Sequence, residues 1–162
     1  MRVYLSIGSN MGDRLGNLRK AGESIEALPG VTLEAAGRIY ETAPLGGPEQ
    51  EWFYNTAVAV ETGAAPADLL RMTRKIEADM GRVRGVKWGP RVIDIDIIFY
   101  GNETVDTPEL VIPHPMAAQR RFVLLPVADI DPGFVHPVLG KTVAALLESL
   151  PEKGQETRLV TA

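Results

Sequence analysis

Alternation of apolar and polar residues predicts three strands in the first part of the chain. Residues 2–7, 31–40 and 54–62 carry apolar side chains at alternate positions. Because successive strand residues point to opposite faces, each segment has one face suited to a core. The second and third segments are predicted to pair as a hairpin. Their connection, Thr42 to Glu51, is longer than a hairpin needs, and such excess length often has a function.

Two other segments have apolar residues at helical spacing. One follows Asp13, whose side chain is suited to capping the first turn, and it ends at Pro29–Gly30. The other begins at Pro66, a residue that fits the first turn of a helix, and its apolar stripe extends to Met80. Both segments are therefore predicted to be helices that bury one side.

A fourth strand is predicted at the end of the run Lys87 to Phe99. One of its faces is an unbroken apolar row made by Ile93, Ile95, Ile97 and Phe99. Asp94 and Asp96 share the opposite face, although Asp is depleted in strands and like charges on one face repel. A cation relieves this repulsion, and Mg2+ is usually held by paired carboxylates together with substrate phosphates. The alternative is a half-buried strand with an acidic outer face.

The order strand, helix, strand, strand, helix, strand predicts an α+β protein. It is the order of a ferredoxin-like βαββαβ core, an antiparallel sheet with helices packed on it. Beyond this core we expect a short strand near Thr104, a loop over residues 108–115, and helical turns over 120–130 in spite of Pro126. A last short helix is expected behind Thr142, so extra C-terminal helices complete the fold.

Length and composition favour one soluble globular domain. The 162 residues suit a single domain, 1–162, with about residues 151–162 as a loosely constrained tail. The chain is 45% apolar and 23% charged, which is ordinary for a soluble protein. With no apolar run of membrane-spanning length and no signal-peptide pattern, we expect a cytoplasmic protein without a membrane partner. The absence of cysteine excludes disulfides, thiolate zinc sites and a cysteine nucleophile.

Positive charge is concentrated just before the fourth strand. Residues 81–91 carry four cations and no acid, so on a chain of net charge −4 the remainder carries −8. A basic, glycine-punctuated segment that leads into an Asp pair fits an anion that also binds metal, such as polyphosphate. The alternative is a solvated loop. The net negative charge argues against general binding of nucleic acid.

The same stretch resembles a known family, the hydroxymethyl-dihydropterin pyrophosphokinases of folate biosynthesis. The run Lys87-x-Gly89-Pro90-Arg91-x-x-Asp94-x-Asp96-Ile97-Ile98 is similar to the signature of that family. The similarity also covers Ile7-Gly8-Ser9-Asn10, Thr42-Ala43-Pro44-Leu45-Gly46, Asn55, Glu77, Gly81-Arg82-Val83-Arg84, Pro113-His114, and Arg120 to Pro126. The resemblance implies a ferredoxin-like core and a reaction in which ATP gives its terminal pyrophosphate to a reduced hydroxymethylpterin and releases AMP.

The resemblance also implies roles for individual residues. Asp94 and Asp96 would hold two Mg2+ ions, and Arg82 and Arg91 match the catalytic arginines. The pterin would contact Thr42, Ala43, Leu45, Phe53, Asn55, Trp88 and Phe122. ATP would contact Glu77, Arg84, Ile97, His114 and Arg120.

Some positions depart from the family pattern. Phe53 stands where some relatives have tyrosine, which removes a hydroxyl and keeps the stacking surface. Arg74 and Gly85 stand where some members have glutamine and lysine, and the loop between Arg84 and Trp88 is one residue shorter than in some. The segment from Gly81 to Pro90 is expected to close over bound substrates.

Two other function classes remain open from the residues alone. A non-catalytic nucleotide- or RNA-binding module shares this order of elements, although two aspartates on the sheet would repel RNA phosphates. A Mg2+-dependent kinase that releases ADP is the other. For the pyrophosphokinase, the expected partners are ATP and the reduced pterin, with the product passed to dihydropteroate synthase and the protein acting as a monomer.

Overall fold

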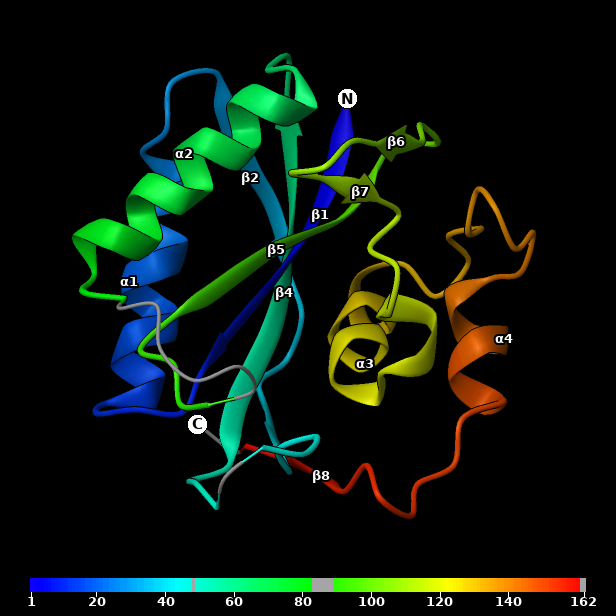
Figure 1. Cartoon of the computed structure of the whole chain (residues 1–162). Coiled ribbons are helices and arrows are strands. Elements are labelled where there is room, and N and C mark those ends of the chain that lie inside the picture. The colour runs from blue at the N-terminus through cyan, green and yellow to red at the C-terminus, as the bar shows by residue number, and fades with distance from the viewer. Residues whose placement is uncertain (48, 83–88, 161–162) are drawn as a thin grey trace.

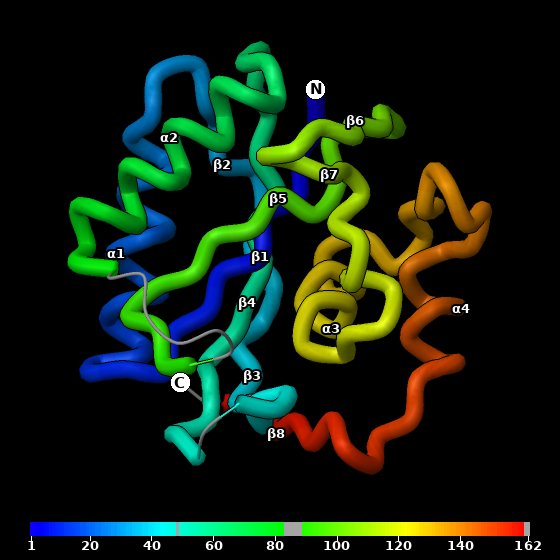
Figure 2. The backbone as a smooth tube through the Cα atoms, viewed as in Figure 1, coloured from blue at the N-terminus to red at the C-terminus, as the bar shows by residue number. Residues whose placement is uncertain are grey.

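The centre of the protein is an antiparallel sheet. The computed structural model describes residues 1–47, 49–82 and 89–160. In this part of the chain the sheet has six strands in the order β5-β1-β4-β3-β8, with β2 also paired to β4 (Figures 1 and 2). Their bounds are β1 Arg2–Ser9, β2 Val31–Ala36, β3 Tyr40–Thr42, β4 Phe53–Thr62, β5 Asp94–Tyr100 and β8 Thr157–Leu159.

Helices cover both faces of this sheet. Helices α1 (Arg14–Glu26) and α2 (Pro66–Asp79) lie on one side, and α3 (Arg121–Ile130) and α4 (Val143–Glu148) lie on the other (Figure 1). A small second sheet pairs β6 (Val105–Asp106) with β7 (Val111–Ile112), and a 3-10 turn, Ala117–Gln119, leads into α3. The predicted α+β class, the ferredoxin-like order and the extra C-terminal helices are thus confirmed.

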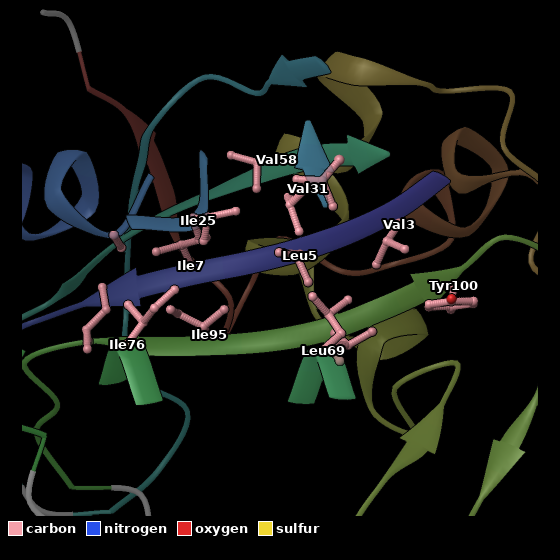
Figure 3. Packing of buried hydrophobic residues seen from close by; sticks show 14 of the residues in the cluster. Val3, Leu5, Ile7, Ile25, Val31, Val58, Leu69, Ile76, Ile95 and Tyr100 are labelled. Atoms are coloured by element: carbon pink, nitrogen blue, oxygen red, sulfur yellow. The ribbon is translucent and has the colours of Figure 1, made fainter. Parts of the chain in front are cut away.

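Two apolar clusters hold these layers together. Figure 3 shows the first, in which Leu5 and Ile7 of β1 pack with Ile25 of α1 and with Leu69 and Ile76 of α2. The second lies between the opposite face of the sheet and helices α3 and α4. The central strands β1, β4 and β5 therefore contribute buried residues to both clusters, and β1 has buried side chains on both of its faces.

Local capping signals act as predicted. The Asp13 side chain accepts a hydrogen bond from the Gly16 amide at 3.0 Å and begins α1. Pro66 is the first residue of α2, and Thr142 accepts from the Ala145 amide at 3.1 Å to begin α4. Helix α3 includes Pro126 without a break.

The predicted strand over residues 31–40 is split. It forms β2 and β3, and between them Gly37 approaches helix α3 closely. A Cβ at Gly37 would lie 2.4 Å from the Pro126 carbonyl oxygen, so this approach requires glycine. The division lets β3 bend away from β2 towards β8.

The predicted apolar row of the fourth strand is wrong at its end. Ile97 is opposite Leu5, but Phe99 is opposite Tyr4, so Ile98 is an extra residue in β5. The bulge reverses the alternation of side chains. Phe99 therefore packs in the second cluster, and Tyr100 takes the place in the first cluster that was predicted for Phe99.

Two further segments differ from expectation. Within the expected loop 108–115, Val111–Ile112 forms β7. In the tail expected to be loosely constrained, Thr157–Leu159 forms β8 against β3. Strand β7 forms by pairing with the nearby β6, whereas β8 depends on a partner far away in the sequence. Neither segment is long enough to show a period. None of the helices in the described residues is long and apolar enough to cross a membrane.

Candidate active site

The Asp pair lies where helix α3 leaves the sheet uncovered. Asp94 of β5 is paired with Gly8 of β1, and Asp96 is paired with Ser6. Their side chains are on the face of the sheet that α3 and α4 cover farther along. This end of the sheet therefore presents a polar surface next to the apolar second cluster. We call the surface formed by Asp94 and Asp96 the carboxylate floor.

Gly8 makes room for a buried amide. A Cβ at Gly8 would lie 2.4 Å from Oδ1 of Asn55, so only glycine fits beside this side chain. Nδ2 of Asn55 donates to the Thr42 hydroxyl at 2.7 Å, and both residues are buried. This pair fixes a carbonyl oxygen in the wall of the site, where it can accept from a ligand.

A first cavity of about 280 Å3 opens on this floor. Its lining consists of Ser6, Gly8, Thr42, Ala43, Pro44, Leu45, Phe53, Asn55, Gly89, Arg91, Asp94, Asp96, Arg120 and Phe122. Among these are six of the seven residues predicted to contact a pterin. Two aromatic rings together with a fixed amide suit a flat heterocycle with a polar edge.

A second cavity of about 560 Å3 adjoins it. It is lined by Leu70, Arg74, Glu77, Arg82, Arg91, Asp94, Ile95, Asp96, Ile97, Pro108, Glu109, Leu110, Val111, His114 and Pro115. Three of the residues predicted for ATP are here: Glu77, Ile97 and His114. Arg120, also predicted for ATP, lies in the lining of the first cavity instead.

Both cavities share the same three polar residues, Arg91, Asp94 and Asp96. Two ligands bound side by side would therefore meet over the Asp pair. The other predicted residues, Arg84 and Trp88, lie outside the described residues, as does most of the segment expected to close over the substrates.

The site concentrates negative charge. Burial raises the pKa of Asp96 to about 7, with further contributions from the charges of Asp94 and Glu77. Burial also raises the pKa of Glu77, although its carboxylate accepts from the Ile95 amide at 2.8 Å and pairs with Arg82. Burial lowers the pKa of both His114 and Arg120. A bound cation would offset the cost of ionising Asp96.

The donor set fits Mg2+ that is held in part by a ligand. No group of three or more His, Asp or Glu side chains able to hold a metal occurs in the described residues. Two carboxylates completed by substrate phosphates are, however, the usual Mg2+ arrangement. Arg82 also borders the Asp pair, with its guanidinium 3.1 Å from Glu77 and 3.3 Å from Asp94. Its Nε is buried and has no hydrogen-bond partner among the described residues.

Asn10 is a site residue whose role the sequence does not reveal. Its buried side chain accepts from the Arg91 amide at 2.7 Å and donates to the Glu51 carbonyl at 2.9 Å. Its own amide donates to the Arg91 carbonyl at 3.0 Å. Asn10 thus joins Arg91 to the connection that precedes Phe53. In the sequence it looks like part of a tight turn, and only the long-range contacts distinguish it.

The fold and site define a class of enzyme. A carboxylate pair shared by two cavities, with arginines beside it, is the arrangement of a metal-dependent transferase of phosphorus groups. A family model described as 7,8-dihydro-6-hydroxymethylpterin-pyrophosphokinase (HPPK) matches residues 4–132. The chain belongs to this family.

Several relatives are similar to this chain in sequence over most of its length. Proteins named 2-amino-4-hydroxy-6-hydroxymethyldihydropteridine pyrophosphokinase from Methylorubrum extorquens and Pseudomonas aeruginosa are 44% and 39% identical over 155 residues. These matches cover 96% of this chain in both cases, and 97% and 95% of the relatives. The relative of that name from Bacillus subtilis is 42% identical over 128 residues, which are 79% of this chain and 77% of that protein.

A solved structure supports the fold. The Plasmodium falciparum HPPK-DHPS structure superposes with a TM-score of 0.75 at 20% identity. The match covers 91% of this chain and 44% of that one, so this chain spans less than half of that protein. By its family, this chain is an enzyme that transfers pyrophosphate from ATP to hydroxymethyldihydropterin in folate biosynthesis.

Proposed function

We propose that the first cavity binds the reduced pterin, that the second binds ATP, and that two Mg2+ ions are held between them by Asp94 and Asp96. The observation that carries this proposal is the pair of adjoining cavities with a shared carboxylate floor. It supports a reaction between two bound substrates over that floor, and it favours an enzyme over a single-ligand binding module.

The residues of the first cavity suit a pterin that presents its hydroxymethyl group to the floor. Phe53 and Phe122 supply apolar ring surface, and Oδ1 of Asn55 accepts from the polar edge of the heterocycle. The backbone of Thr42 to Leu45 lines the same wall. Phe53 has no hydroxyl, so it contributes ring contact alone.

In the reaction, the pterin hydroxyl oxygen bonds to the β-phosphorus of ATP. The bond between that phosphorus and the oxygen bridging to the α-phosphate breaks, AMP leaves with the electron pair, and the hydroxyl proton is released. Arg82 and Arg91 would hold phosphoryl oxygens as their charge develops. When bound, Mg2+ supplies neutralisation of the phosphate charge and favours ionisation of the hydroxyl.

The nucleotide product tests this assignment. With ATP, Mg2+ and reduced hydroxymethylpterin, we expect one AMP per pterin diphosphate and no accumulation of ADP, because attack is at the β-phosphorus. Phosphorus NMR of the mixture distinguishes the two nucleotides, and a reaction without the pterin is the control. Stoichiometric ADP would instead assign the protein to the kinases that transfer one phosphoryl group.

Asn10→Ala is expected to lower kcat about tenfold and to destabilise the fold by about 1–3 kcal/mol, because it leaves the half-buried Arg91 amide without its side-chain acceptor. Steady-state kinetics and urea unfolding measure the two effects. Asn102→Ala, at an exposed asparagine, is the matched control. Unchanged kcat in a measurably destabilised Asn10→Ala protein would show that Asn10 supports the fold and not the position of Arg91.

We also propose that the enzyme acts as a cytoplasmic monomer and passes its product to dihydropteroate synthase. The HPPK-DHPS chain of the structural relative supports the link to the next enzyme. Sedimentation of the active protein tests the oligomeric state.

A further inference from the structure

The C-terminal segment Gln155–Val160 is attached to one wall of the first cavity. Its strand β8 lies beside β3 (Figure 2). In this pairing Thr157 is opposite Thr42. The Glu156 carbonyl accepts from the Ala43 amide at 3.1 Å. The cavity wall that begins at Thr42 is therefore hydrogen-bonded to residues near the end of the chain.

The side chain of Gln155 hydrogen-bonds to the opposite wall of the first cavity, at the start of α3. Its Oε1 accepts from the Arg121 amide at 2.9 Å, and its Nε2 donates to the Gln119 carbonyl at 3.1 Å. These two backbone groups belong to the peptides on either side of Arg120. The Gln155 side chain thus hydrogen-bonds to the backbone on both sides of Arg120, a residue that lines the first cavity.

The local structure of α3 explains why these two hydrogen bonds matter. Arg120 is the N-cap of α3, in an extended conformation with φ −120° and ψ 109°, and its side chain makes no capping hydrogen bond. Helix N-termini have amides without helical acceptors, which side chains usually satisfy. Gln155 supplies such an acceptor from 34 residues away. It therefore caps the first amide of α3.

The first turn of α3 carries two groups of the site. Arg120 and Phe122 both line the first cavity, and Arg120 is attracted by the charges of Asp94 and Asp96. The facing wall is the segment that β8 holds. The two walls are thus joined through the C-terminal segment.

We propose that Gln155 is a positioning residue for pterin binding, which sets Phe122 and Arg120 at the correct distance from the wall formed by Thr42 to Leu45. This role rests on the proposed assignment of the pterin to the first cavity. Gln155 lines neither cavity, so it acts through α3 and not by contact with substrate.

The test compares full-length wild type, Gln155→Leu and Gln155→Glu. Gln155→Leu keeps the size of the side chain and removes both hydrogen bonds, so we expect the KM and Kd of the pterin to rise about fivefold to tenfold. The KM of ATP should change less than about twofold, because Gln155 contacts none of the second cavity and Arg120, which it positions, lines the first cavity. Gln155→Glu keeps the acceptor for the Arg121 amide and loses the donor, so an intermediate effect is expected. Lys153→Ala, at an exposed position of the same tail, is the control and should match wild type.

Two further measurements separate positioning from general stability. Hydrogen exchange of the Arg121 amide should accelerate in Gln155→Leu, while the melting temperature should fall by no more than about 3 °C, because Gln155 is only half-buried. Wild-type pterin KM and Kd in Gln155→Leu would overturn the positioning role. So would a rise in both KM values that follows a large fall in melting temperature. If wild-type protein itself binds no pterin, the proposed assignment of the first cavity fails, and the positioning role fails with it.

Discussion

Asp94→Ala and Asp96→Ala are each expected to lower kcat by at least about a thousandfold, because each removes a carboxylate from the shared floor and with it a metal contact worth several kcal/mol in the transition state. The two cavities meet at these side chains, so the loss affects the reaction step itself. Rates are measured at saturating ATP and pterin over a range of Mg2+ concentrations. Asp106→Ala, at an exposed carboxylate of β6, is the matched control and should behave as wild type.

The fold should survive both alanine substitutions. A related substitution, Asp96→Asn, tests directly how the charge of Asp96 affects stability. The folded protein holds the Asp96 proton more tightly than an unfolded chain does, because burial raises this pKa to about 7. Its contribution to stability is therefore complete below about pH 4 and is lost as the pH rises towards 7. Without Mg2+, Asp96→Asn should lack this loss and melt at least about 2 °C above wild type at pH 8.

Either of two results would contradict the assignment of the Asp pair. Substantial Mg2+-dependent turnover in both alanine variants would show that the metal is bound elsewhere. A melting temperature of Asp96→Asn that follows wild type from pH 5 to pH 8 would show that the Asp96 carboxyl does not have the raised pKa expected of it.

Arg82→Ala and Arg91→Ala are expected to lower kcat about a hundredfold to a thousandfold, with a much smaller change in the KM of ATP. Arginine contacts that strengthen as phosphoryl charge develops stabilise the transition state more than the bound substrate. Arg82 lines the second cavity between Glu77 and Asp94, so its guanidinium is placed to contact a phosphate bound there.

Single-turnover kinetics at saturating Mg2+ measure this chemical step. Arg82→Lys keeps the charge and loses the planar fork, so it should recover only part of the rate. Arg71→Ala, an exposed arginine on α2, should leave both constants unchanged. A raised KM for ATP with wild-type kcat would assign Arg82 and Arg91 to ground-state binding alone.

Much of the fold follows from the sequence because the signals are local. Alternation predicts β1 and β4, helical spacing predicts α1 and α2, and Asp13 caps as its residue type suggests. The prediction fails where a strand depends on its partners. The bulge at Ile98 places Phe99 on the other face, because pairing with β1, and not the spacing along β5, sets the register there.

The candidate site, like the fold, is predicted only in part by the sequence. The spacing of Asp94 and Asp96 by itself determines that their carboxylates share one face of a regular strand, and β5 is regular over these residues because its bulge comes later, at Ile98. The sequence motif also points to Arg82 and Arg91. Only the tertiary structure decides that two cavities meet at these carboxylates, since the first depends on the start of α3 and the second on α2 and residues 108–115, which are distant from β5 or from each other in the sequence. It also decides the roles of Asn10 and Gln155, whose hydrogen bonds join segments 81 and 34 residues apart, a distance over which no local pattern carries information.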